Sequence, residues 1–168
     1  KKIVDEMQKK DLSETDLFLP RVLQKGNAKL DEMVQPIFQE IAKWAKTSGE
    51  KELVLVGISN GGRISRAIEA KLAKSKCDAN IKKLRFVSIV GACKGSSLVN
   101  LANKVGLSWF MSKNISEEMP TDSIRNQQLN QDWVDGLSHG LTREYTFIAS
   151  PHDWQVTNYD SSLLAVDK

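Results

Sequence analysis

The spacing of apolar residues changes along the chain between the period of helices and that of strands. Segment 30–45 repeats apolar side chains every three or four residues, which predicts an amphipathic helix. Pro36 lies inside this pattern, so we expect either a kink there or a helix that begins near Val34. The short apolar run 17–23 favours a strand, and Pro20 places it at a strand end or a sheet edge.

Three later segments are rich in apolar and β-branched residues and predict strands, at 52–58, 84–91 and 145–150. The first is apolar without alternation, which is typical of a central strand covered on both faces. Between the first two, segment 63–72 has a helical pattern, with one apolar face surrounded by charged residues. The apolar positions are Ile64, Ala67, Ile68 and Leu72, and the charged ones are Arg63, Arg66, Glu69 and Lys71. Strands that alternate with helices predict an α/β fold with a parallel sheet and right-handed crossovers.

About fifty residues, 94–143, separate the last two predicted strands where one helix would be enough. Helices are expected at 97–105 and 123–137, and an apolar group with Trp109 and Phe110 lies between them. An insertion with aromatic residues near the carboxyl ends of parallel strands could form a lid or cap. The alternative is that these two aromatic side chains pack into the core.

The chain has 168 residues, of which 40% are hydrophobic and 27% charged, as in soluble globular proteins. We expect residues 1–168 to form a single domain. The net charge is only +3 and the lysines are scattered, so a nucleic-acid partner is not indicated. Cys77 and Cys93 are too few for a disulfide framework, and no zinc-ligand spacing occurs, so neither metal nor cofactor is implied. Oligomeric state is not indicated.

No apolar run approaches the roughly 20 residues that span a bilayer, so no transmembrane segment is expected. The first ten residues are too charged for a signal peptide, which favours the cytoplasm. The sequence does not begin with Met, so an upstream leader and secretion both stay open.

The sequence from Gly57 to Gly61 has the pattern G-x-S-x-G between a predicted strand and a predicted helix. A sharp turn at this place would expose the hydroxyl of Ser59 above the sheet, where it could act as a nucleophile. The backbone N–H of Asn60, at the start of the helix, would stabilise an oxyanion. The alternative is an ordinary turn between strand and helix.

A serine nucleophile needs a base that is oriented by an acid. Asp153 follows the last predicted strand and would lie in the same crevice as Ser59. It could instead be a loop carboxylate or a helix cap. The only histidines are His139 and His152, and His152 is the preferred base because it is next to Asp153.

Three stretches carry a resemblance to a known family. Segment 53–62 resembles the nucleophile elbow of the α/β-hydrolases, particularly the lipase-like branch. Segment 89–96 is similar to the strand and turn that follow the elbow, and 147–163 to the family's acid loop. The resemblance covers residues 16–164. It implies a three-layer α/β/α fold with a mostly parallel sheet and an ester substrate. The aromatic composition of the insertion further suggests an acyl or lipid-like substrate, with contacts expected at Trp109, Phe110 and Trp154.

Two parts of the family pattern are not met. The family's catalytic histidine follows a further strand and helix after the acid, and only fifteen residues follow Asp153 here. Strands that precede the elbow in the family are also lacking. We favour a part of a longer hydrolase over a reduced relative with a rearranged sheet.

The sequence therefore predicts a serine esterase of lipase type that forms an acyl-enzyme on Ser59. An acyltransferase would use the same residues, because water and an alcohol acceptor attack the same acyl-enzyme. A catalytically silent hydrolase-like binding module is the second alternative, and the unlocated histidine is its main support.

Overall fold

The computed structural model describes most of the chain between residues 18 and 150. The described ranges are 18–23, 27–47, 51–75, 80–107, 109, 111–137 and 141–150.

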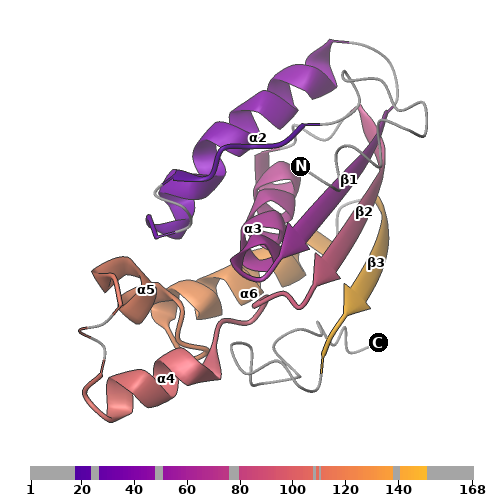
Figure 1. Ribbon diagram of the computed structural model, residues 1–168. Helices are drawn as coiled ribbons and strands as arrows, with labels where there is room; N and C mark the ends of the chain where they lie inside the picture. Colours follow the sequence, from indigo (N-terminus) through magenta and orange to yellow (C-terminus); the bar gives the residue numbers. More distant parts are fainter. Residues whose placement is uncertain are drawn as a thin grey trace, which may run out of the picture.

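Three parallel strands form the sheet: β1 (Lys51–Ile58), β2 (Ile81–Ile89) and β3 (Thr142–Ile148), in the order β1-β2-β3 (Figure 1). Parallel neighbours require crossover connections, and helices supply both. The predicted α/β class and parallel sheet are confirmed. Within the described sheet, however, β2 is the central strand and β1 lies at an edge, where the sequence placed it centrally.

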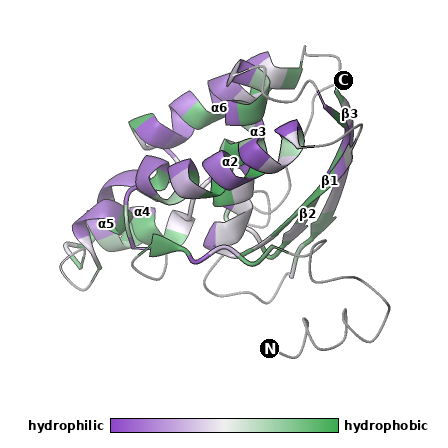
Figure 2. Ribbon diagram, turned by 90° about the horizontal axis from the view of Figure 1, so that it is seen from above, coloured by the Kyte–Doolittle hydropathy of each residue, from purple (hydrophilic) through white to green (hydrophobic). Residues whose placement is uncertain are grey.

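Three helices cover one face of the sheet: α2 (Leu30–Lys46), α3 (Asn60–Ser75) and α6 (Ile124–Leu137) (Figure 1). Their residues alternate between hydrophilic and hydrophobic, as expected of helices with one buried side (Figure 2). Helix α2 begins at Leu30 and continues through Pro36, so the later start near Val34 is wrong. Acidic residues in its first turn favour this start because they face the positive end of the helix dipole.

The core lies between these helices and the covered face of the sheet. Leu84 and Phe86 of β2 are fully buried there, in one apolar cluster with Leu72 of α3 and Leu129 of α6. Phe86 also contacts the rings of Tyr145 and Phe147, at centroid distances of 6.0 and 5.9 Å. The alternating burial of β2 and β3 shows that the helices cover a single face.

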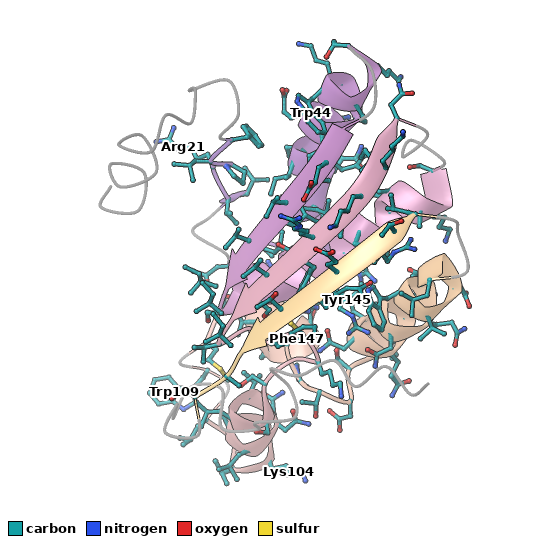
Figure 3. All side chains as sticks on the ribbon, turned by 90° about the vertical axis from the view of Figure 1, so that its right-hand side faces the viewer. Arg21, Trp44, Lys104, Trp109, Tyr145 and Phe147 are labelled. Carbon is teal, nitrogen blue, oxygen red and sulfur yellow. The ribbon has the colours of Figure 1, made fainter. Side chains whose placement is uncertain are left out.

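The opposite face of the sheet is turned toward the viewer in Figure 3, and no described helix lies over it. Val54, Val56 and Ile58 of β1 are between 49 and 57% exposed on this side. In the described structure, β1 is therefore not covered on both faces, as was predicted for it. Near the amino ends of the strands the same face is charged, since Arg85 lies between Glu52 and Glu144 and forms ion pairs with both. We call it the open face.

The run 17–23 was predicted as a strand, and this is wrong for the residues that the structure describes. Residues 18–22 have no regular secondary structure, and Leu23 has a 3₁₀-helical conformation. Phe18 and Leu19 are 55 and 64% exposed, so they do not gain the burial that a strand would give them. Pro20 lacks the N–H that pairing would use.

The segment 94–143 holds α4 (Ser97–Lys104), α5 (Lys113–Glu118) and α6, and the first and last match the predicted helices. Helix α5 was not predicted, because its six residues lack an apolar face. The Ser112 side chain caps it by accepting a hydrogen bond from the Ile115 N–H. Helix α6 packs against α3 and belongs to the main core.

Helices α4 and α5 lie beyond the carboxyl ends of the strands, toward which the arrowheads point in Figure 1. Across the described ranges, none of the helices combines the length and the apolar character needed to span a bilayer.

Candidate functional site

Ser59 lies at the corner between β1 and α3, and its backbone is in the left-handed region, with φ of 54°. A residue with a Cβ adopts this conformation at a cost of about 1–2 kcal/mol, so the surroundings must impose it. The residue is exposed, at the carboxyl edge of the sheet. The predicted sharp turn and the exposure of this serine are therefore confirmed.

Glycine is required at only one of the two flanking positions. A Cβ on Gly57 would overlap the Gly61 carbonyl and lie 2.6 Å from the Gly62 nitrogen, so only glycine lets β1 pass beneath the start of α3. A Cβ on Gly61 would meet nothing within 4 Å outside its own helix. Steric crowding thus explains the first glycine of G-x-S-x-G, Gly57, but does not require the second, Gly61.

The peptide unit between Ser59 and Asn60 is anchored by its carbonyl. The Ser59 oxygen accepts hydrogen bonds from the N–H groups of Gly62 and Ala92, both at 3.0 Å. Because a trans peptide is planar, its N–H points opposite to its C=O. Two bonds on the inner side therefore fix the direction of the Asn60 N–H, at the positive end of the α3 dipole.

Val90, directly after β2, is a second residue in the left-handed region, with φ of 45°. This conformation is rarer still for a β-branched side chain. The Val90 N–H donates to the Ile148 carbonyl at 2.6 Å, and the Ser59 N–H donates to the Ile89 carbonyl at 3.2 Å. These bonds tie together the carboxyl ends of all three strands. The sequence does not reveal this position, since nothing in the residue type indicates such a turn.

Behind the corner, the side chains of Ser88 and Cys93 are fully buried and lie 3.3 Å apart, Oγ to Sγ. A Cβ on Gly62 would come within 3.1 Å of the Cys93 sulfur, so this pair packs directly under the start of α3. Burial raises the pKa of the Cys93 thiol. Cys93 is a free thiol, as predicted, and in this environment it is a packing residue.

Helix α3 also buries three charged side chains that the sequence analysis placed around its apolar face. Arg63, Arg66 and Glu69 are at most 2% exposed, because partners from later segments surround them. Arg63 donates from Nε to Asn126 Oδ1 at 2.7 Å and from Nη2 to the Glu118 carbonyl at 2.9 Å. Burial lowers the pKa of both arginines to about 10.

Glu69 is the centre of the second part of this cluster. Its carboxylate accepts hydrogen bonds from Trp133 Nε1 and Arg143 Nε, both at 2.9 Å, and from the Tyr145 hydroxyl at 2.6 Å. Burial raises the pKa of Tyr145, and the Glu69 charge raises it further. Partners that lie more than sixty residues away in the sequence satisfy this carboxylate, so helical periodicity alone could not have revealed it.

The remaining predicted site residues lie mostly outside the described part of the chain. These are Phe110, His139, His152, Asp153 and Trp154. Trp109 is described, is 71% exposed, and lies with Lys104 beyond the carboxyl ends of the strands (Figure 3). It does not pack into the core, which was the alternative for it.

The described chain ends at Ser150, two residues after β3, at the edge of the sheet that carries Ser59, and the loop after β3 begins there. Because β2 lies between β1 and β3, the start of this loop is two strand spacings from the serine, or about 10 Å.

Within the described ranges, no group of three or more His, Cys, Asp or Glu side chains is arranged to hold a metal ion. Comparisons of the chain with models of protein families, with curated proteins and with solved structures found no match.

Proposed function

We propose that this protein is a serine hydrolase that cleaves carboxylic esters through an acyl-enzyme on Ser59. The observation that carries the proposal is the strained, exposed conformation of this residue at the corner between a parallel strand and a helix. An ordinary turn could relieve such strain by using glycine at this position. Strained backbone at one exposed residue is characteristic of functional sites.

The anchored Ser59–Asn60 peptide supports the same chemistry. Acyl transfer passes through a tetrahedral intermediate with a negatively charged oxygen, which must be met by fixed hydrogen-bond donors. The Asn60 N–H is such a donor, because the carbonyl of its own peptide is held on the opposite side by Gly62 and Ala92.

We place the acid of the proposed triad at Asp153 and the base at His152, with His139 as the second candidate. A gap of about 10 Å between Ser59 and the start of the loop after β3 leaves room for an imidazole between serine and carboxylate. The proposed fold is the three-layer α/β/α arrangement of the α/β-hydrolases, in which the open face of the sheet is covered as well.

In the proposed reaction, Ser59 Oγ attacks the ester carbonyl carbon while the histidine takes the hydroxyl proton. The oxyanion accepts a hydrogen bond from the Asn60 N–H. Collapse of the intermediate then expels the alcohol, which takes the proton from the imidazolium. Water then attacks the acyl-enzyme in the same way and releases the carboxylic acid. An alcohol in place of water would make the protein an acyltransferase.

The proposed substrate is apolar on its acyl side, and we assign its contacts to Trp109, Phe110 and Trp154. The exposure of Trp109 beyond the strand ends supports this assignment. We restrict the proposed lid to α4, α5 and the segment between them, because α6 belongs to the core.

The proposal is tested by labelling the chain with a fluorophosphonate probe and reading the intact mass. The wild type should gain one probe per chain, and Ser59→Ala should gain none. The matched control is Ser75→Ala, which removes a serine at the opposite end of α3 and should label like the wild type.

Folding of each variant is checked by circular dichroism. A folded wild type that is not labelled, or a labelled Ser59→Ala variant, would reject the serine hydrolase and leave the silent binding module. Product analysis of an activated ester with and without added alcohol then separates hydrolysis from acyl transfer.

A further inference from the structure

The start of α3 is linked to its own second turn through a closed path of contacts. The Ser59 carbonyl accepts a hydrogen bond from the Ala92 N–H. Ala92 begins a tight turn after β2, closed by a bond from the Gly95 N–H to the Ala92 carbonyl at 3.0 Å. The carbonyl of Cys93, inside that turn, accepts a hydrogen bond from Arg66 Nη1 at 3.0 Å. Arg66 lies seven residues after Ser59, on α3 itself.

Arg66 is deeply buried, and part of its guanidinium has no hydrogen-bond partner. Its side chain is 2% exposed, its guanidinium lies 4.9 Å from the centroid of the Trp133 ring, and its Nε has no hydrogen-bond partner. Burying an arginine that satisfies few of its five donors is costly, and the Glu69 charge and the Trp133 ring offset part of this cost. Among the described residues, its guanidinium donates one hydrogen bond, to the turn whose Ala92 N–H holds the Ser59 carbonyl.

We propose that Arg66 is a positioning residue for the Ser59–Asn60 peptide. By holding the Cys93 carbonyl, it keeps the Ala92 N–H on the Ser59 oxygen, and it thereby fixes the direction of the Asn60 N–H. The strained Val90 lies two residues before this turn, so an unsupported turn would let the backbone relax toward an ordinary conformation. The consequence for catalysis rests on the proposed function, whereas the effect on the turn does not.

Arg63 provides a matched control, because it is a second buried arginine on the same helix. Its bonds go to Asn126 and Glu118 and not to the turn after β2. Replacing either arginine by methionine keeps an unbranched side chain of similar length and removes the charge and the donors. The two variants therefore differ in which contacts they lose.

The first experiment measures amide hydrogen exchange by NMR in the full chain. In Arg66→Met, exchange of the Ala92 amide should accelerate roughly tenfold relative to amides in α2, as expected when support for one buried hydrogen bond is lost. In Arg63→Met the same ratio should stay at the wild-type value. If Arg66→Met does not fold, Arg66→Gln is used, since its amide is too short to reach the Cys93 carbonyl.

The second experiment compares hydrolysis of an ester with that of its thionoester, whose sulfur accepts weaker hydrogen bonds. Arg66→Met should lower kcat for the ester on the order of tenfold, less than loss of a whole oxyanion donor, with KM unchanged. Its preference for the ester over the thionoester should fall as well. A role in folding alone would leave this preference unchanged, as we expect for Arg63→Met.

Ala92 exchange that stays at the wild-type ratio in a folded Arg66 variant overturns the proposal. An equal acceleration in Arg63→Met overturns it too. If the wild type is not labelled by the fluorophosphonate, the proposed function fails, and the exchange measurement still decides the role of Arg66.

Discussion

Helix α3 connects two regions that are organised in opposite ways. Around its middle, the Glu69 carboxylate is matched by donors from Trp133, Arg143 and Tyr145, and the cluster is buried. At its beginning, Ser59 is exposed, with a strained backbone and with its peptide anchored on the inner side. The first region joins α3 to α6 and β3. The second leaves Ser59 accessible at the carboxyl edge of the sheet.

The difference separates polar groups that stabilise the fold from polar groups that are available for chemistry. A buried polar group usually has its partners within the protein, whereas a reactive one is held in place by its backbone and left accessible. By this criterion the buried Arg63 and Glu69 of α3 are structural. The corner at Ser59 is the candidate site, and substitutions in the two regions should therefore affect different properties.

The largest effect is expected for Glu69→Gln. This change leaves the Arg143 guanidinium, whose side chain is 7% exposed, without its buried counter-charge, and should lower the free energy of unfolding by about 3–5 kcal/mol. Urea denaturation measures the loss. The control is Glu144→Gln on the open face, where the ion pair with Arg85 is exposed and no measurable change is expected. Equal effects of the two changes would contradict the structural assignment of Glu69.

A smaller loss is expected for Gly57→Ala. Its Cβ would overlap the Gly61 carbonyl, so the corner must shift, at a cost of about 1–3 kcal/mol in the free energy of unfolding. Labelling by the fluorophosphonate should fall as well. Gly61→Ala, with open space for its Cβ, should be neutral or stabilising by about 0.5–1 kcal/mol. Thermal unfolding of both variants is the measurement, and a Gly61→Ala variant as unstable as Gly57→Ala would reject this account of the corner.

The smallest effect is a gain in stability. Ser59→Gly removes the steric cost of the left-handed backbone and should raise the free energy of unfolding by about 1 kcal/mol relative to Ser59→Ala, which keeps a Cβ. Both variants lack the nucleophile, so the comparison isolates backbone strain. Equal stability of the two in urea denaturation would show that the corner stores no strain at this position.

Local patterns were sufficient for much of the fold. The unalternating run that became β1, and the apolar stripe of α2, specify their elements through neighbours in the sequence. The strand predicted at 17–23 failed because it rested on apolar residues alone, and Phe18 and Leu19 find no partner strand in the described sheet. The short α5 depends on a cap at Ser112 that hydrophobic periodicity does not register.

Some residues of the candidate site could be predicted from the sequence and others could not. Ser59 could be found because its glycine neighbours and its place after a strand are visible in the sequence. Arg66 and Val90 could not, since their roles come from contacts with segments that only the fold brings near. The predicted acid and base, Asp153 and His152, lie outside the described residues and stay predictions.

The ion pairs on the open face also bear on how the chain folds. Strand β1 pairs with β2 across a loop of about thirty residues, and β3 pairs with β2 across about sixty, so closing the second loop costs roughly 0.6 kcal/mol more. A slip of one residue in the later pairing would turn Glu144 toward the covered face and away from Arg85. The charges at this end of the sheet thus penalise mispaired intermediates and select the register in which the last strand joins.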